Sequence, residues 1–329
     1  MHAKTVLVIT APGQGAQAPG FLLPWLDVPG VAERLGTWSE LAGADLIRCG
    51  TTASADEIKD TAVAQPLLVA AALATAEALL DALPAAGSGL AAAGHSVGEL
   101  AAGAIAGAAS PEDAVRLVAV RGRAMAGAAA AQPTGMTAVL GGDEATVLAS
   151  VEAHGLTAAN VNGAGQIVAA GTMEQLAAFA ADPPAGARLR PLPVAGAFHT
   201  VHMAPAVADL SMAASDVTVS DPRIVLLSNR DGAIVSYGPD WLARIIAQVA
   251  APVRWDACMR TMAGHGATAL IELPPAGTLT GLARRGLPGV ALQALKTPDD
   301  LDTARTLLAE HSDARTSGPA TSPTWRRHP

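Results

Sequence analysis

Aromatic, thiol and lysine side chains are all scarce in this sequence. Five Trp, three Phe and one Tyr stand among 329 residues with only two Cys, so the chain can form neither a ring-rich core nor a disulfide framework. No Cys/His cluster has the spacing of a zinc site. The formal net charge of −8 argues against nucleic acid as a general partner. These absences exclude several classes of protein before any motif is considered.

Apolar residues, by contrast, are plentiful. Half of the sequence is hydrophobic and 76 residues are Ala, which excludes wholesale disorder. The core must therefore be built from Ala, Val, Leu and Ile, in helices packed closely on one another or on a sheet. A chain of this length can form one large domain or two ordinary ones.

The N-terminal apolar run and the Ala-rich stretches predict neither a secretory signal nor a membrane span. The N-terminal apolar run Thr5–Thr10 is too short for a signal sequence. The Ala-rich stretches at 91–109 and 124–131 are interrupted or bounded by Gly and by polar residues such as His95 and Glu99. Neither reaches the roughly 20 apolar residues that a spanning helix needs. We therefore expect a soluble, cytoplasmic protein that does not bind a membrane.

Short β-branched runs alternate with longer Ala- and Leu-rich stretches, which predicts an α/β domain with a mostly parallel sheet. Val6–Thr10 predicts a buried first strand. Ser110 and Pro111 begin a helix, as N-cap and first helical residue, with acidic residues in the first turn. The other elements expected outside the middle of the chain are helices at 63–83, 99–109, 241–249, 255–264, 279–285 and 300–310, and strands at 90–93, 224–228, 269–272 and 290–295.

The middle of the chain has a different pattern. Its elements are expected as strand 135–140, helix 143–154, strands 157–161 and 166–170, helix 173–181 and strand 188–194. This βαββαβ order is the split unit of ferredoxin-like folds. We expect a small subdomain at 134–194, inserted into a larger one made of 1–133 and 195–311. The polar, Pro-rich segment 312–329 predicts a disordered tail.

The strongest local motif is GHSVGE at Gly94–Glu99. It matches G-x-S-x-G, the tight turn that presents a nucleophilic Ser between a strand and a helix. The glycines allow a sharp turn, and the N-terminus of the following helix offers N–H groups to a developing oxyanion. In a chain with 33 Gly, a chance turn is an equally good interpretation of the bare motif.

A nucleophilic Ser needs a base, and His199 and His202 are the best placed of the histidines. His95 adjoins the Ser, where successive side chains diverge, and the others lie near the termini, at a helix end or in a loop. The i, i+3 spacing of His199 and His202 is compatible with a metal, but no third ligand is evident. For either residue a core or surface histidine remains an open interpretation.

A Gly-rich loop, GQGAQ at Gly13–Gln17, follows the first strand. It lacks both the full G-x-G-x-x-G pattern and the Walker Lys, so it is a weak candidate for a dinucleotide or phosphate loop. Loops at the carboxyl end of a first strand are nevertheless where α/β sheets place ligand contacts. Gln14, or its backbone N–H, is therefore a candidate to face the site.

Together these motifs resemble those of the malonyl-CoA:acyl carrier protein transacylases. These are stand-alone acyltransferases of bacterial fatty-acid synthesis, related to the acyltransferase domains of polyketide synthases. The resemblance covers residues 4–310, in family order, and is close for actinobacterial members. The matching segments are GQGAQ at 13–17, AQPL at 64–67, GHSVGE at 94–99, Arg121-Gly122 with Met125, the hairpin at 160–171, Phe198-His199 with Met203, Ser228-Asn229, Gln248 and PVRW at 252–255.

The resemblance implies a role for each matching residue. Ser96 would be the nucleophile and His199 its general base. Arg121 would hold the free malonyl carboxylate through its planar guanidinium. The remaining implied site residues are Gln14 and Val97 for the oxyanion hole, Gln65, Phe198 and Asn162 for substrate binding, and Gln248 and Asn229 for orienting His199 in place of an Asp.

The resemblance also implies a fold and a reaction. The fold would be an α/β-hydrolase-like large subdomain with the ferredoxin-like insert, and the site would lie between them. The reaction would pass malonyl from malonyl-CoA to holo acyl carrier protein by a ping-pong mechanism, with no metal or other cofactor and with a monomeric enzyme. Two alternatives stay open. A serine esterase or thioesterase would have no use for a buried Arg121, and a non-catalytic scaffold would not need Ser96 and His199.

Overall fold

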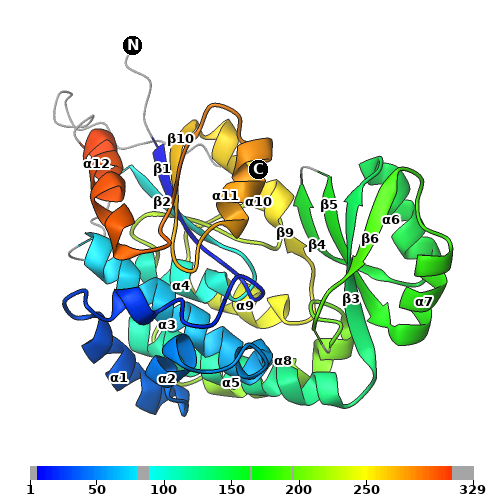
Figure 1. The fold of residues 1–329 in the computed structure, drawn as a ribbon, viewed down its shortest axis with the longest axis horizontal. Helices are drawn as coiled ribbons and strands as arrows, with labels where there is room; N and C mark the ends of the chain where they lie inside the picture. The colour runs from blue at the N-terminus through cyan, green and yellow to red at the C-terminus, as the bar shows by residue number, and fades with distance from the viewer. Residues whose placement is uncertain (1–5, 81–88, 164, 195, 313–329) are drawn as a thin grey trace.

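The computed structural model describes residues 6–80, 89–163, 165–194 and 196–312 and contains two β-sheets surrounded by helices (Figure 1). The larger sheet takes its strands from both ends of the described chain. The smaller sheet, on the right of Figure 1, comes mainly from the middle. The α/β class predicted from the sequence is confirmed.

The larger sheet has six strands in the order β11-β10-β1-β2-β7-β8, parallel except for the β7–β8 pair. Their bounds are β1 Val6–Ala11, β2 Leu90–Gly94, β7 Val225–Leu227, β8 Ile234–Val235, β10 Ala267–Glu272 and β11 Ala291–Ala294. Strand β1 is buried along its whole length, as its continuous apolar run predicts. Ala11 at the end of β1 pairs with Gly94 at the end of β2. The loops that carry Gln14 and Ser96 therefore leave the sheet side by side.

The smaller sheet has five strands in the order β6-β3-β5-β4-β9. Their bounds are β3 Thr134–Gly141, β4 Thr157–Gly163, β5 Gln166–Thr172, β6 Ala187–Pro191 and β9 Val253–Arg254. The first four pair in an antiparallel manner and alternate with helices in the predicted βαββαβ order. The sequence does not predict β9, which comes from far along the chain and pairs in parallel with β4. A segment outside 134–194 therefore completes this sheet.

Helices cover both sheets. Their bounds are α1 Val31–Ala42, α2 Leu46–Thr51, α3 Thr61–Leu80, α4 Gly98–Ile105, α5 Pro111–Ala130, α6 Glu144–Ala153, α7 Met173–Ala181, α8 Ala204–Ala214, α9 Gly238–Gln248, α10 Trp255–Gly264, α11 Thr278–Gly286 and α12 Leu301–Ser312. Helix α5 starts as predicted, because the Ser110 hydroxyl accepts the N–H of Asp113 and Pro111 occupies the first turn. Helices α6 and α7 pack on the smaller sheet (Figure 1).

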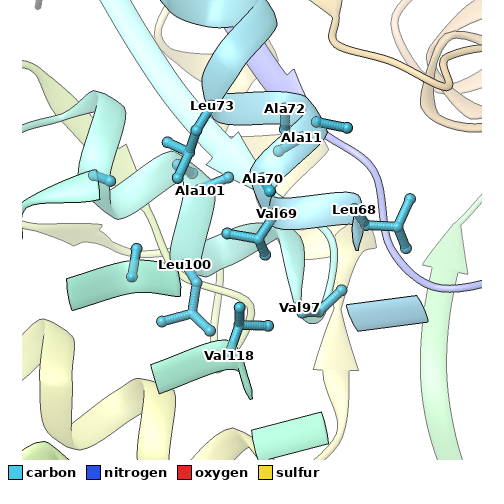
Figure 2. Packing of buried hydrophobic residues seen from close by; sticks show 14 of the residues in the cluster. Ala11, Leu68, Val69, Ala70, Ala72, Leu73, Val97, Leu100, Ala101 and Val118 are labelled. Carbon is cyan, nitrogen blue, oxygen red and sulfur yellow. The ribbon is translucent and has the colours of Figure 1, made fainter. Parts of the chain in front are cut away.

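Helix α3 is apolar around almost its whole circumference and lies in the main core. Figure 2 shows Leu68 and Val69 of this helix in one cluster with Val97, with Leu100 of α4 and with Val118 of α5. Ala side chains between these larger residues let the helices approach closely, as the composition predicts. By length and composition α3 would also be long enough to cross a membrane, and 78% of that stretch is buried inside the protein.

The sequence does not predict helices α1, α2 and α8. Helix α1 is bounded by Gly30 and Gly43, which have φ values of 85° and 66°. Between them Val31, Leu35 and Trp38 are buried, and the helix contacts α3 and α5. This i, i+4, i+7 spacing is the signal that could have predicted it. Short helices of this kind depend on tertiary packing for their stability.

Several predicted ends are wrong. The helix expected at 99–109 ends at Ile105, because Gly107 adopts a left-handed φ of 81°. The strand expected at 188–194 ends at Pro191, because the N–H of Val194 turns back to the carbonyl of Leu192 instead of continuing the pairing with β3. The helix expected from residue 63 begins at Thr61. Ser312, placed in the tail, belongs to α12. Residues 81–83 of the predicted helix and 313–329 of the predicted tail lie outside the described residues.

The buried carboxylate of Glu272 holds the start of α11. Its oxygens accept the backbone N–H groups of Gly277, Leu279 and Thr280, and the Thr280 hydroxyl. Glu272→Gln would leave one of these N–H groups facing an amide NH₂, so we expect the free energy of unfolding to fall by about 1–3 kcal/mol. Denaturant unfolding measures this change. A loss below about 0.5 kcal/mol, as at an ordinary surface site, would contradict the assignment.

Candidate active site

Ser96 lies in a tight turn between β2 and α4. Its φ of 53° falls in the left-handed region, which residues other than glycine rarely adopt. A Cβ on Gly94 would lie 2.0 Å from the carbonyl carbon of Gly98, and a Cβ on Gly98 would lie 2.3 Å from the carbonyl oxygen of Ala11. Only glycine fits at both positions, so the strand and the helix can meet in a sharp turn with Ser96 at its tip. Backbone strain of this kind is typical of functional sites.

The side chain of Asn229, just after β7, holds this turn. Its Oδ1 accepts the backbone N–H of Ser96 at 2.7 Å, and its Nδ2 donates to the carbonyl of Gly94 at 2.8 Å. One buried amide therefore fixes both Ser96 and the end of β2.

His199 faces Ser96 from a second strained position, with a φ of 63°. Its Nε2 lies 2.7 Å from Ser96 Oγ, and its Nδ1 lies 2.8 Å from the backbone oxygen of Gln248. Because a carbonyl oxygen can only accept, Nδ1 carries the proton and Nε2 accepts from the Ser96 hydroxyl. Both ring nitrogens are engaged, so His199 has none left to share a metal ion with His202.

The environment of His199 keeps its imidazole neutral. Burial lowers the pKa of His199 to about 3, and the nearby Arg121 guanidinium acts in the same direction, while the hydrogen bond to Gln248 opposes both. At neutral pH the side chain is therefore in the form that can take a proton from Ser96.

Arg121, on α5, is a buried cation beside the Ser96 hydroxyl. Its Nη1 donates to Gln65 Oε1 at 2.6 Å, and its Nη2 donates to Gln248 Oε1 at 3.0 Å and lies 3.4 Å from Ser96 Oγ. Among the described residues its Nε–H has no hydrogen-bond partner, and no carboxylate lies within ion-pair distance. Burial lowers the pKa of Arg121 to about 10, with Glu99 opposing, so the side chain stays cationic at neutral pH. It can still receive an anion.

Glu99 completes this network, and sequence reasoning does not single it out. Its Oε1 accepts the backbone N–H of Asn229 at 2.9 Å, and its Oε2 accepts from the side-chain amide of Gln248. Burial raises the pKa of Glu99 to about 8, while the N–H of Asn229 and the charge of Arg121 oppose the rise. The available signal was its place as the last residue of GHSVGE, in the first turn of an otherwise Ala-rich helix.

Two backbone N–H groups near Ser96 are free to donate. Within the described part of the chain, neither Gln14 nor Val97 uses its N–H in a hydrogen bond. The Gln14 side chain donates to the carbonyl of Lys59 and the hydroxyl of Thr61, which fixes the loop after β1. Such donors can stabilise an oxyanion on a carbonyl that Ser96 attacks.

A pocket opens beside Ser96 and His199. The predicted site residues that line it are Gln14, Gln65, Ser96, Val97, Phe198 and His199. Arg121 and Gln248 do not line it directly but hydrogen-bond to residues that do. Asn162 lies at its edge, where Oδ1 is 2.8 Å from Nε2 of the lining residue His95. The structure therefore gathers the predicted site residues in one place.

Comparison with known proteins identifies the family. Residues 26–319 match the family described as acyl transferase domain. This chain belongs to that family. The resemblance predicted from the sequence motifs is confirmed.

Two curated relatives of this acyl transferase are named malonyl CoA-acyl carrier protein transacylase. The one from Mycobacterium tuberculosis is 52% identical over 90% of this chain and 98% of its own. The one from Escherichia coli is 32% identical over 91% and 99%.

Solved structures agree with the sequence relatives. The crystal structure of MCAT from Mycobacterium tuberculosis matches with a TM-score of 0.87 and 51% identity, over 91% of this chain and 99% of that one. A complex of a malonyl-transacylase with a type II PKS acyl-carrier protein matches with a TM-score of 0.84 and 26% identity, over 92% and 100%. The acyl transferase therefore shares its fold with these structures over 91% and 92% of its length.

The low pKa of His199 predicts how Ser96 reactivity depends on pH. An ordinary histidine would be half protonated near pH 6.5 and would fail as a base below it. In this acyl transferase we expect a fluorophosphonate, a serine-directed probe, to label Ser96 at a nearly constant rate down to about pH 5. Labelling is followed by mass spectrometry, and circular dichroism at each pH checks that the protein stays folded. A labelling rate that halves near pH 6.5 would contradict the neutral, buried imidazole.

Proposed function

We propose that this acyl transferase moves a malonyl group from malonyl-CoA to the phosphopantetheine thiol of holo acyl carrier protein. The observation that supports this most is Arg121, a buried cation that has no ion-pair partner among the described residues and lies 3.4 Å from Ser96 Oγ. Malonyl differs from acetyl by one carboxylate, which is the group that a guanidinium binds with two parallel hydrogen bonds. The names of the relatives support the same donor and acceptor.

In the first half-reaction, His199 Nε2 takes the hydroxyl proton of Ser96 while Oγ attacks the thioester carbonyl. The N–H groups of Gln14 and Val97 donate to the oxyanion of the tetrahedral intermediate. Collapse of the intermediate breaks the C–S bond, and His199 returns the proton to the departing CoA thiolate. The products are malonyl-Ser96 and free CoA. The Gln248 carbonyl stabilises the imidazolium that forms in between.

The second half-reaction is the reverse with a new thiol. The pantetheine thiol of the carrier protein gives its proton to His199 and attacks the malonyl ester carbonyl. Collapse breaks the C–O bond, and His199 protonates Ser96 Oγ. The mechanism is ping-pong, because CoA leaves before the carrier protein reacts.

Neighbouring side chains set the substrate preference. Gln65 holds the Arg121 guanidinium through its Oε1, so that the remaining donors face the malonyl carboxylate. Phe198 lies beside His199 in the pocket, where its ring fills the space that the methyl branch of methylmalonyl would need. Asn162, paired with His95 at the pocket edge, would contact the arm of CoA or of the carrier protein.

The two sheets support the finer architecture expected from the sequence. The order β6-β3-β5-β4 with its two helices is that of a ferredoxin-like unit, which we take as the small subdomain 134–194. The mostly parallel larger sheet would then form the α/β-hydrolase-like subdomain of residues 1–133 and 195–311. No step above needs a metal or redox cofactor, and we expect a cytoplasmic monomer that binds neither nucleic acid nor membrane.

Transfer to a carrier protein tests this function directly. Wild-type protein with malonyl-CoA and holo carrier protein should give malonyl-carrier protein faster than free malonate. Ser96→Ala should abolish transfer, and His199→Ala should slow it by about 10²–10⁴-fold, since it removes the general base. Mass spectrometry of the carrier protein and chromatography of malonate measure both outcomes. Hydrolysis that exceeds transfer would identify an esterase or thioesterase instead, and transfer by Ser96→Ala would remove Ser96 from the mechanism.

The ratio of malonyl to acetyl transfer tests Arg121. Arg121→Ala leaves the malonyl carboxylate desolvated and unpaired, so kcat/KM for malonyl-CoA should fall by about 10²–10⁴-fold. Acetyl-CoA makes no such contact, and its slow transfer should stay the same or rise. If both substrates lose equally on folded protein, Arg121 supports the fold and does not anchor the carboxylate.

A further inference from the structure

Gln248 hydrogen-bonds to both the base His199 and the guanidinium of Arg121. Its backbone carbonyl accepts the Nδ1–H of His199 at 2.8 Å, and its side-chain Oε1 accepts from Arg121 Nη2 at 3.0 Å. It is the last residue of α9 and is only 5% exposed. A displacement of this one residue would therefore move the base and the guanidinium together.

Glu99 holds the side chain of Gln248 from the opposite side. Gln248 Nε2 donates to Glu99 Oε2 and, at 3.3 Å, to Asn229 Oδ1. An amide donates only at its nitrogen and accepts only at its oxygen, so a nitrogen that faces Glu99 leaves the oxygen to face Arg121. The flipped amide would place its oxygen against the Glu99 carboxyl oxygens and its NH₂ against the guanidinium. Glu99 therefore selects the orientation that supports Arg121.

The other oxygen of Glu99 fixes the neighbouring part of the site. Its Oε1 accepts the backbone N–H of Asn229, whose side chain holds the N–H of Ser96. Glu99 is 2% exposed, and among the described residues none of its hydrogen bonds reaches Ser96, His199 or Arg121 directly. Its hydrogen bonds therefore reach the reacting groups only through Gln248 and Asn229, while its charge also acts on Arg121 across the Gln248 amide.

The Gln248 side-chain amide separates the Glu99 carboxyl from the Arg121 guanidinium. A carboxylate in direct contact with Arg121 would form a buried ion pair, and a substrate carboxylate would then have to compete with it. A neutral amide can orient the guanidinium while leaving its charge unpaired. The arrangement keeps a buried cation in a fixed position, one hydrogen bond away from the pocket-lining Gln65 and Ser96, with its charge unpaired among the described residues.

We propose that Glu99 is a positioning residue for malonyl specificity, which acts by orienting the Gln248 side chain against Arg121. The inference rests on the proposed function, because it takes Arg121 as the anchor of the malonyl carboxylate. Two separate N–H donors point at the two oxygens of Glu99, so this role requires the ionised carboxyl, in which both oxygens accept. Glutamine has the same shape but offers a single acceptor oxygen.

Substitutions of Glu99 test the proposal through the malonyl-to-acetyl ratio of kcat/KM. Measured above the pKa of about 8 that burial gives Glu99, where its carboxyl is ionised, Glu99→Gln should lower this ratio by about tenfold or more, because one N–H donor then faces an NH₂ and the Gln248 amide loses its fixed orientation. Glu99→Asp keeps two acceptor oxygens and should recover part of the ratio. Glu272→Gln is the matched control, since Glu272 is also buried and accepts backbone N–H groups, but its partners do not line the pocket. The control should lose stability and keep the wild-type ratio.

A double-mutant cycle with Gln248→Ala shows whether Glu99 acts through Gln248. Gln248→Ala removes the side-chain contact to Arg121 but keeps the backbone carbonyl that holds His199. In that background Glu99→Gln should change the ratio by less than about threefold, because the route to Arg121 is already lost. Equal effects of Glu99→Gln in both backgrounds would overturn the proposed route.

The outcomes separate this inference from the proposed function. If wild-type protein transfers no malonyl group, the proposed function fails. If wild-type protein transfers malonyl and Glu99→Gln keeps the wild-type ratio on folded protein, only the role of Glu99 fails. If Glu99→Gln does not fold, the malonyl-to-acetyl ratio is measured on Glu99→Asp instead. A Glu99→Asp ratio equal to wild type, with both substrates slowed alike, would then show a purely structural role.

Discussion

The hydrogen bond from the Ser96 backbone N–H to Asn229 Oδ1, 2.7 Å long, is the interaction on which the site depends. Ser96 occupies a left-handed conformation that costs energy unless neighbouring groups hold it. Asn229 supplies that support by binding Ser96 and the end of β2 at once, and Glu99 in turn binds the N–H of Asn229. The strained turn, the base and the guanidinium therefore belong to one buried polar network.

Such a network needs a rigid and dry surrounding, which the composition provides. Helices α3, α4 and α5 pack through Ala and short aliphatic side chains, so they lie close together (Figure 2). Burial in this core lowers the pKa of His199 and of Arg121 and raises that of Glu99. Small side chains permit the close helix contacts, and the charged groups of the site are buried beside them.

The sequence predicts those parts of the structure whose signals are local. The buried strand β1, the capped start of α5 and the GHSVGE turn all follow from short patterns, and each is found in place. It does not predict β9 or the position of Glu99, because both depend on partners far along the chain. Strand β9 pairs with β4, and Glu99 meets Gln248 at a separation of 149 residues. The roles of Arg121 and Gln65 came from family resemblance, since a helical Arg ordinarily faces solvent.

The central claim is that Ser96 carries the malonyl group as an ester beside a buried Arg121. The most direct measurement is peptide mapping by mass spectrometry after the protein is mixed with malonyl-CoA and quenched in acid. The peptide that contains Ser96 should gain the mass of one malonyl group, which holo carrier protein removes and which Ser96→Ala does not acquire. No added mass, or a malonyl group on a residue other than Ser96, would contradict the central claim.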